Sequence, residues 1–346
     1  MPRVSICLPT RNRSLTLRET ICAMLAQTFQ DWEIIVGDDA STDDTEDVVT
    51  SFSDTRIRYV RHARNLGIYQ NWNSLIPLCR GEYVAIYHDH DVYLPTIVEK
   101  CCALLDRNPR MAFVHTAIVL LGTGSQPNAL IVRDFDAVTE GRSFLRDQIN
   151  GSCVTAATAM VRRTAYETVG LFDPSYGLPA DVEMWLRLAE GNQVGYLREP
   201  QALILARGPA EAAITASEDL LGQRRIVREW VSRVYGSGVT SLVAQLRLQK
   251  NLQIYILRAV LRASFYLPPE RFGKVMRALS ACALPPVSAC LALSAESDVL
   301  HRLLRRIASR EARTTLEARR KIALNYCLEN NTICLALSLR RQTADR

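Results

Sequence analysis

The chain has 346 residues, of which 48% are hydrophobic and 23% charged, with a formal net charge of +6. This composition excludes a disordered or fibrous protein, and the length allows one large domain plus a smaller one, or two domains. The charge is divided unevenly, because residues 220–346 hold 22 Lys/Arg against 8 Asp/Glu whereas residues 1–219 hold 20 against 28. We therefore expect an acidic body followed by a basic region.

The N-terminus and the cysteines indicate the compartment. The first residues enter an apolar run without the basic region, long hydrophobic segment and cleavage site of a signal peptide. The 10 cysteines lie in apolar surroundings without metal-ligand spacing, as reduced core cysteines do. Both features predict a cytoplasmic protein.

Strands and helices are predicted to alternate along the first third of the chain. Val4 to Leu8 is an apolar run that ends at Pro9, which is typical of a strand buried on both faces. Ser14 is a candidate N-cap for the helix that follows, whose buried side is predicted to hold Leu15, Leu17, Ile21 and Leu25. Further strands are predicted over 32–37 and 56–60. Such alternation with short connections predicts a parallel, doubly wound sheet covered by helices.

Acidic residues follow two of the predicted strands. Asp39 follows the strand over 32–37, and Asp89 and Asp91 follow a strand over 83–87. Ligands of open α/β sheets bind at the carboxyl ends of strands, and two close carboxylates repel each other unless a cation lies between them. We therefore expect Asp89 and Asp91 to bind Mn²⁺ or Mg²⁺ together with a diphosphate. A solvated acidic turn is the alternative, and for an isolated Asp-x-Asp pattern it is the commoner one.

The middle of the chain contributes one more candidate residue. A strand is predicted over 111–121, and the Gly, Ser, Pro and Asn residues of 122–140 predict a loop over the site. Asp181 lies in the first turn of a predicted amphipathic helix. There it is either a favourable N-terminal helix residue or a catalytic group, and local sequence leaves both open.

The C-terminal part is predicted to be helical. Its apolar stretches fail the length and hydrophobicity of a membrane-spanning helix. The basic amphipathic stretch 299–307 fits either an anionic membrane surface or packing against neighbouring helices. We expect a boundary near 215, between an α/β domain over 1–215 and a basic, mostly helical region over 216–346. The helices are predicted near 217–235, 241–266, 269–283 and 297–327.

Several motifs of residues 3 to about 215, in this order and spacing, resemble glycosyltransferase family 2. They are Val4-Ser5-Ile6-Cys7-Leu8-Pro9-Thr10-Arg11-Asn12-Arg13, the stretch from Ala26 to Asp43, Asn65-Leu66-Gly67, Gly81-Glu82-Tyr83-Val84, Asp89-His90-Asp91 and the stretch from Asp181 to Leu188. The resemblance implies the A-type glycosyltransferase fold, a Rossmann-like, mostly parallel sheet flanked by helices, here with a C-terminal α-helical region. It makes 1–215 the nucleotide-sugar-binding catalytic domain.

The resemblance also implies roles for individual residues. Asp89 and Asp91 would hold Mn²⁺ or Mg²⁺ against the donor diphosphate, and Asp181 would be the general base. The residues implied to contact the donor are Pro9, Thr10, Arg11, Asp39 and Asp89. Three positions depart from the family pattern: Arg11 replaces a usually aromatic residue, His90 stands where an acid is common, and Ala180 precedes Asp181 where the family often has Glu. Which of His88, Asp89, His90 and Asp91 contact the metal is therefore left open.

The implied activity is transfer of a single sugar from a nucleoside-diphosphate sugar, most simply a UDP-sugar, to a hydroxyl of a glycan or lipid-linked saccharide. One base and one cation suffice for such a direct displacement, which inverts the anomeric carbon. A non-catalytic nucleotide-sugar-binding protein and a sugar nucleotidyltransferase are the alternatives. Nucleic-acid binding is not expected, since no reading motif is present. A peripheral position on the inner face of the membrane and a homo-oligomer both remain open.

Overall fold

The computed structural model describes residues 1–122, 127–151, 153–205, 209–238, 241–245 and 267–280, with four single positions between 248 and 263. These residues form two compact units. The first holds the described residues of Met1–Asp173 and Met184–Ala206, and the second those of Pro174–Glu183 and Arg207–Lys321. The predicted boundary near 215 stays a prediction.

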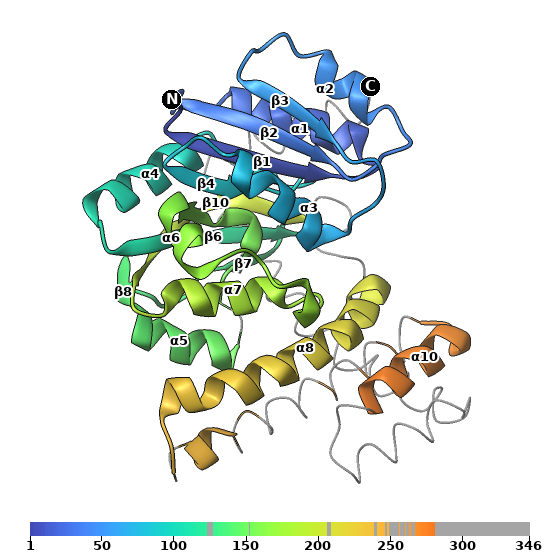
Figure 1. Ribbon diagram of the computed structural model, residues 1–346. Coiled ribbons are helices and arrows are strands. Elements are labelled where there is room, and N and C mark those ends of the chain that lie inside the picture. The colour runs from blue at the N-terminus through green and yellow to red at the C-terminus, as the bar shows by residue number, and fades with distance from the viewer. Residues whose placement is uncertain are drawn as a thin grey trace. The chain divides into compact units, whose positions relative to one another are not determined.

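The N-terminal half of the first unit is a parallel sheet of the βαβ type (Figure 1). Its strands lie in the order β3-β2-β1-β4 and pair in parallel throughout. The strands are β1 (Val4–Thr10), β2 (Trp32–Asp38), β3 (Ile57–Arg61) and β4 (Tyr83–Ile86). The connecting helices are α1 (Ser14–Leu25), α2 (Thr45–Thr50) and α3 (Ile68–Leu75), the last continued by a 3-10 turn over Ile76–Leu78.

The second half of the sheet is mixed. β9 (Met160–Arg162) runs antiparallel between β4 and β6 (Met111–Leu121), and β10 (Gln193–Leu205) pairs in parallel with β6. Three shorter strands pair antiparallel with these: β5 (Val92–Tyr93), β7 (Pro127–Ile131) and β8 (Val138–Glu140). Six of the ten described strands, β1 to β4, β6 and β10, therefore run in one direction, so the sheet is mostly parallel as predicted. The helices of this half are α4 (Ile97–Arg107), α5 (Gly141–Asn150) and α6 (Arg163–Val169), together with the residues of α7 (Ala180–Ala189) from Met184 onward.

Alternation along β1 decides which helices cover which face of the sheet. Val4, Ile6 and Leu8 are fully buried in one cluster with the apolar faces of α1 and α4. The buried residues of α1 are Leu17, Thr20, Ile21 and Met24. On the opposite face, Gly37 of β2 leaves room for Leu75 of α3, because a Cβ at position 37 would lie 2.6 Å from a Leu75 methyl carbon.

Some local predictions were wrong, and one strand was missed. The segment 122–140, expected to be a loop, contributes β7 and β8, and β10 was not predicted. Ser14 is the first residue of α1 rather than its cap, and its backbone N–H donates to Asp43 Oδ2 at 3.0 Å.

The second unit contains α8 (Pro209–Tyr235) and α10 (Pro269–Ser280). Trp230 and Val231 of α8 are buried, as are Phe272 and Met276 of α10. The predicted helix over 297–327 and the basic stretch 299–307 lie outside the described residues. Among the residues that are described, none of the helices combines the length and the apolar character needed to cross a membrane.

Candidate active site

The candidate site is centred on the turn that follows β4. Residues 87–91 leave the sheet and return to it as β5, which pairs with β10. The backbone N–H of His88 donates to the hydroxyl of Tyr93 at 2.7 Å, and the rings of Tyr87 and Tyr93 stack with centroids 4.4 Å apart. Because both tyrosines are fully or almost fully buried, the apolar core holds the turn in place.

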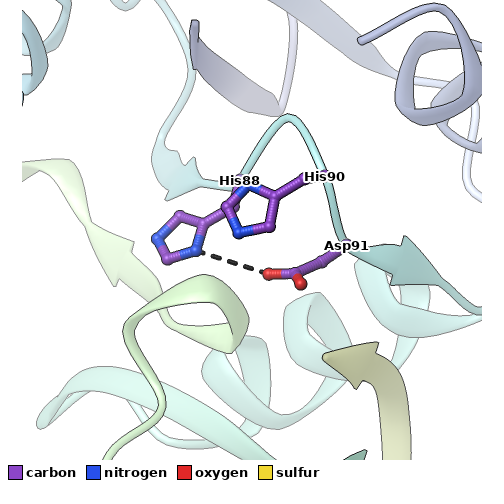
Figure 2. A group of neighbouring side chains, drawn as sticks. All are labelled: His88, His90 and Asp91. Atoms are coloured by element: carbon purple, nitrogen blue, oxygen red, sulfur yellow. Dashed lines mark ion pairs between the residues drawn. The ribbon is translucent and has the colours of Figure 1, made fainter. Parts of the chain in front are cut away.

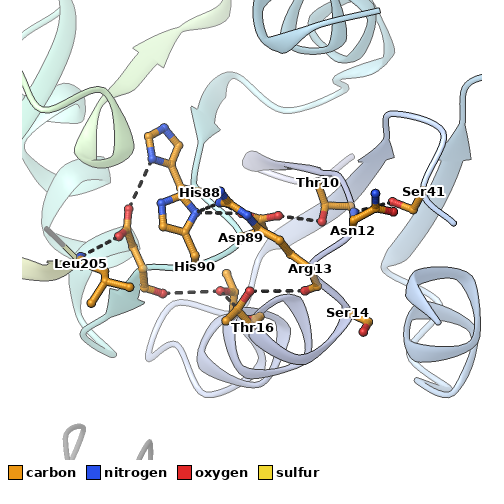
Figure 3. Close-up of polar contacts among 12 residues, drawn as sticks. Thr10, Asn12, Arg13, Ser14, Thr16, Ser41, His88, Asp89, His90 and Leu205 are labelled. Atoms are coloured by element: carbon orange, nitrogen blue, oxygen red, sulfur yellow. Dashed lines mark hydrogen bonds and ion pairs between the residues drawn. The ribbon is translucent and has the colours of Figure 1, made fainter. Parts of the chain in front are cut away.

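Asp89 is buried and bound to the loop that follows β1 (Figure 3). Its Oδ2 accepts a hydrogen bond from Thr10 Oγ1 at 2.7 Å, and its Oδ1 accepts one from Arg13 Nη1 at 3.2 Å. His90 Nδ1 lies 2.8 Å from the same Oδ1. Burial alone would raise the pKa of Asp89, but the hydrogen bonds from His90 and Thr10 and the charge of Arg13 outweigh it, so the pKa lies below its usual value. Asp89 is therefore a buried carboxylate held in its charged form.

Asp91 is also buried but is bound differently. Its Oδ1 accepts a hydrogen bond from the backbone N–H of Leu205, at the end of β10, at 3.1 Å. Its Oδ2 lies 3.3 Å from His88 Nδ1, yet has no hydrogen-bond partner, and neither does the buried Nε2 of His88. Buried polar atoms without a partner are unfavourable. They indicate that the turn is built to receive a further group.

Three side chains of the turn could hold a metal ion. Among the residues that the structure describes, His88, His90 and Asp91 each offer one donor atom, and these atoms lie within 4.8 Å of one another (Figure 2). Imidazole nitrogen and carboxylate oxygen are both ligands of Mn²⁺. The residues present therefore fit a divalent ion. Of the predicted pair, Asp91 belongs to this group, whereas Asp89 contacts it through His90.

Asp39, which follows the end of β2, binds the backbone of the motif Asn65-Leu66-Gly67. Its Oδ1 accepts from the backbone N–H of Leu66 at 2.6 Å, and its Oδ2 accepts from that of Gly67 at 3.0 Å. Its own backbone N–H donates to the carbonyl of Thr10 at 2.9 Å. Gly67 has a φ of 86°, a conformation that favours glycine. Asp39 thus joins the ends of β1 and β2 to the start of α3.

The loop after β1 carries the other predicted donor contacts. Pro9 pairs with Gly37 in the β1–β2 register, and Arg11 is exposed. Asn12 adopts a positive φ of 52°, and its backbone N–H donates to Ser41 Oγ at 2.9 Å. The loop therefore bends back toward the end of β2, where Asp39 lies.

The structure brings most of the predicted residues to one edge of the first unit. Thr10 links Asp39 and Asp89 through two hydrogen bonds, and Asp91 follows in the same turn. The contact of Arg13 with Asp89 was not predicted, although Arg13 ends the first motif of the resemblance. The link from Leu205 to Asp91 was also missed, because β10 was not predicted.

Asp181 belongs to the second unit. It is the second residue of α7, and its Oδ1 lies 2.8 Å from the backbone N–H of Val182. Its assignment as a base stays a prediction.

Comparisons with known proteins agree with this architecture. WcaA of Escherichia coli (strain K12), named provisionally as a colanic acid biosynthesis glycosyl transferase, is 35% identical over 220 residues, covering 62% of this chain and 76% of WcaA. The crystal structure of S. aureus TarS 1–349 is similar with a TM-score of 0.55 at 14% identity, over 90% of this chain and 92% of that one, and the protein is also known in complex with UDP-GlcNAc. Mannosyltransferase PcManGT from Pyrobaculum calidifontis, in complex with GDP-Man and Mn²⁺, gives a TM-score of 0.54 at 18% identity, over 94% of this chain and 86% of that one.

The sheet order, the polar cluster at the strand ends and these structural likenesses define an A-type glycosyltransferase fold, which confirms the predicted fold class. The model of the family described as glycosyl transferase family 2 matches residues 5–170. The chain belongs to glycosyl transferase family 2, and it is a glycosyltransferase.

Proposed function

We propose that the protein transfers one sugar from a nucleoside-diphosphate sugar to a hydroxyl of a glycan or lipid-linked saccharide, with inversion at the anomeric carbon. The observation that carries this proposal is the joining of Thr10, Asp39 and Asp89 into one hydrogen-bonded set at the carboxyl ends of parallel strands. This edge of an α/β sheet is where nucleotides bind. The complexes of TarS with UDP-GlcNAc and of PcManGT with GDP-Man support a donor of this class, and we expect a UDP-sugar.

In this proposal the loop after β1 and the end of β2 bind the donor nucleotide. Pro9, Thr10 and Arg11 line the loop, and the buried carboxylate of Asp39 contacts the base or ribose of the nucleotide. A divalent ion, Mn²⁺ or Mg²⁺, would be held at the turn after β4 through Asp91 and would offset charge on the departing diphosphate. Arg13, whose side chain is 49% exposed beside Asp89, adds a second positive charge for the same diphosphate.

The acceptor hydroxyl needs a base, and we assign that part to Asp181. A single displacement requires only one carboxylate near the acceptor, unlike hydrolysis by paired carboxylates. The support is the position of Asp181 in the first turn of α7, within the stretch that resembles the family motif.

The test is a transfer assay with a panel of nucleotide sugars, Mn²⁺ and saccharide acceptors. Release of nucleoside diphosphate that depends on the acceptor is the expected result, and the absence of turnover with every donor would overturn the proposal. Asp181→Asn should lower the rate of transfer by at least about 100-fold while UDP binding is kept. Glu190→Gln, just after the end of the same helix, is the matched control. Full transfer by Asp181→Asn would remove this residue from the base role.

We also propose that the enzyme works at the inner face of a membrane, where lipid-linked acceptors are found. The excess of basic residues in 220–346 supports this position. Co-sedimentation of the full chain with anionic, but not neutral, phospholipid vesicles is the expected result. Equal recovery with both would contradict it.

A further inference from the structure

We propose that the metal site selects a transition-metal ion over Mg²⁺, because its protein ligands are the imidazoles of His88 and His90 together with the carboxylate of Asp91. Asp89 then acts on His90 rather than on the ion. This inference rests on the proposed function in placing a divalent ion at the turn after β4. It goes beyond that function by assigning the ligand set and the class of metal.

Asp91 and His88 each have a buried polar atom without a hydrogen-bond partner. The side chain of Asp91 is completely buried, and its Oδ2 has no hydrogen-bond partner although it lies 3.3 Å from Nδ1 of His88. The other nitrogen of His88 is also buried without a partner. A charged oxygen and a ring nitrogen this close, with their hydrogen-bonding capacity unmet, are suited to share one cation.

His90 lies beside Asp89 and Arg13. Its Nδ1 lies 2.8 Å from Asp89 Oδ1, and Arg13 Nη1, which can only donate, lies close to the same nitrogen. These contacts are compatible when Nδ1–H and Nη1–H both donate to Asp89 Oδ1. Metal-binding histidines usually donate one ring N–H to a carboxylate, which directs the other nitrogen to the ion. Asp89 is placed to accept such a bond, so that Nε2 of His90 becomes the metal ligand. The rings of His88 and His90 stack with centroids 5.5 Å apart, which keeps both nitrogen donors on one side of the turn (Figure 2).

Asp89 is excluded from direct contact with the ion. Both of its oxygens are already bound within the protein, Oδ2 by Thr10 and Oδ1 by Arg13. The guanidinium nitrogen of Arg13 lies 3.2 Å from Oδ1, so a positive charge occupies the place that a cation would take. Asp89 is therefore a positioning residue for His90.

The ligand set decides the metal. Mg²⁺ prefers oxygen ligands and keeps several waters, whereas imidazole favours ions later in the first transition series. Two nitrogen donors and one carboxylate should therefore bind Mn²⁺ and Co²⁺ well and Mg²⁺ poorly. A turn with acids at positions 88 and 90 would lack this preference.

The experiment uses the full chain with MnCl₂, CoCl₂ or MgCl₂, each with and without UDP. Pulsed electron paramagnetic resonance of bound Mn²⁺ should show coupling to imidazole ¹⁴N, and Asp89→Asn should keep that coupling. The double variant H88D/H90D should lose it, and its preference for Mn²⁺ over Mg²⁺, measured by calorimetry, should fall at least tenfold. His62→Gln, distant in sequence from the turn, is the control and should change neither quantity.

Bound Mn²⁺ without ¹⁴N coupling in the unsubstituted protein would overturn the inference, and this spectrum requires no variant to fold. An unchanged metal preference in a folded H88D/H90D protein would overturn it as well. The outcome is separable from that of the proposed function: nitrogen-bound Mn²⁺ without sugar transfer would support the ligand set alone, whereas sugar transfer with oxygen-only coupling would support the enzyme alone.

Discussion

Thr10 donates a hydrogen bond from Oγ1 to Oδ2 of Asp89 across 2.7 Å, between residues 79 positions apart in the chain. Both residues are buried, with 3% and 4% of their surfaces exposed. The bond joins the end of β1 to the turn after β4. It makes the position of Asp89 depend on the first strand of the sheet.

Replacing Thr10 by Val keeps the shape of the side chain but removes this donor. A buried carboxylate oxygen then loses a partner, so the free energy of unfolding should fall by about 1–3 kcal/mol. Urea denaturation measures the change. Thr168→Val, an exposed position on α6, is the control and should change stability by less than about 0.5 kcal/mol. Equal stability of Thr10→Val and the unsubstituted protein would show that the bond contributes nothing.

Asp39→Asn should weaken both folding and donor binding. Leu66 and Gly67 donate to different oxygens of Asp39, and an amide replaces one of these oxygens by an NH₂ group, which would face a backbone N–H donor to donor. We expect a loss of about 1–3 kcal/mol in unfolding free energy and weaker UDP binding by calorimetry. Asp44→Asn, at an exposed position nearby, should leave both quantities unchanged. UDP affinity that survives in a folded Asp39→Asn protein would exclude Asp39 from donor binding.

Gly81→Ala should destabilise the first unit because β1 leaves no room for a side chain there. A Cβ at position 81 would lie 2.6 Å from the backbone nitrogen of Ser5 and 2.7 Å from the carbonyl carbon of Val4. Backbone atoms of a central strand cannot move aside cheaply, so we expect a loss of about 1–3 kcal/mol, seen as a lower melting temperature. Gly151→Ala, where no atom lies within 4 Å of the added Cβ, is the control. Similar melting of both variants would contradict the steric argument.

His115 should make the protein sensitive to mild acid. Burial, and to a smaller degree the charge of Arg133, lower its pKa to about 3, and neither ring nitrogen has a hydrogen-bond partner. In the unfolded chain the pKa of a His is near 6.5, so as the pH falls the unfolded chain binds the proton before the folded protein does. The stability that depends on neutral His115 is therefore complete above about pH 6.5 and is lost as the pH falls. At pH 5 the loss is about 2 kcal/mol.

The variant His115→Phe cannot take up this proton, so its free energy of unfolding should fall less between pH 7.5 and pH 5. The comparison is made by urea denaturation of both proteins at both pH values. The other titrating groups are shared, and the difference between the two pH slopes therefore isolates His115. Identical slopes would show that the imidazole is already protonated or solvated in the folded protein.

The sequence predicts those parts of the fold whose patterns are local. The apolar run 111–121 coincides with β6, and the runs that begin at Val4 and Trp32 coincide with β1 and β2. β10 was missed because Arg198, Glu199 and Pro200 interrupt its pattern. The register between β10 and β6 shifts between Leu197 and Ala202, so the interruption is accommodated as an irregularity in a strand that continues.

Helix faces were predicted with partial success. Leu15 was expected on the buried side of α1, yet it is 78% exposed. It precedes the buried Leu17 by two positions, or about 200° around the helix axis, so it points away from the sheet. Periodicity counted from the buried residue, rather than from the first apolar one, would have avoided this error.

For the site, local sequence predicts which residues stand at strand ends but not what they contact. Asp39, Asp89 and Asp91 lie at these ends, as predicted. The hydrogen-bond donor to Asp91 could not be predicted. It is the backbone N–H of Leu205, which lies 114 positions later in the chain. His88 and His90 were considered as alternatives, and only the packing of the turn brings their nitrogens close to Asp91.

The strand β9 connects the two parts of the sheet over a short length. Met160, Val161 and Arg162 of this strand pair with β4, whereas only Met160 and Val161 pair with β6. The two parts of the sheet therefore meet along a seam at most three residues wide. Few interstrand bonds protect a seam of this length from solvent. Amide protons of β9 should therefore exchange with deuterium sooner than those of β1 or β6, and the sheet should begin to part there while the pairing of β1 with β2 is still intact.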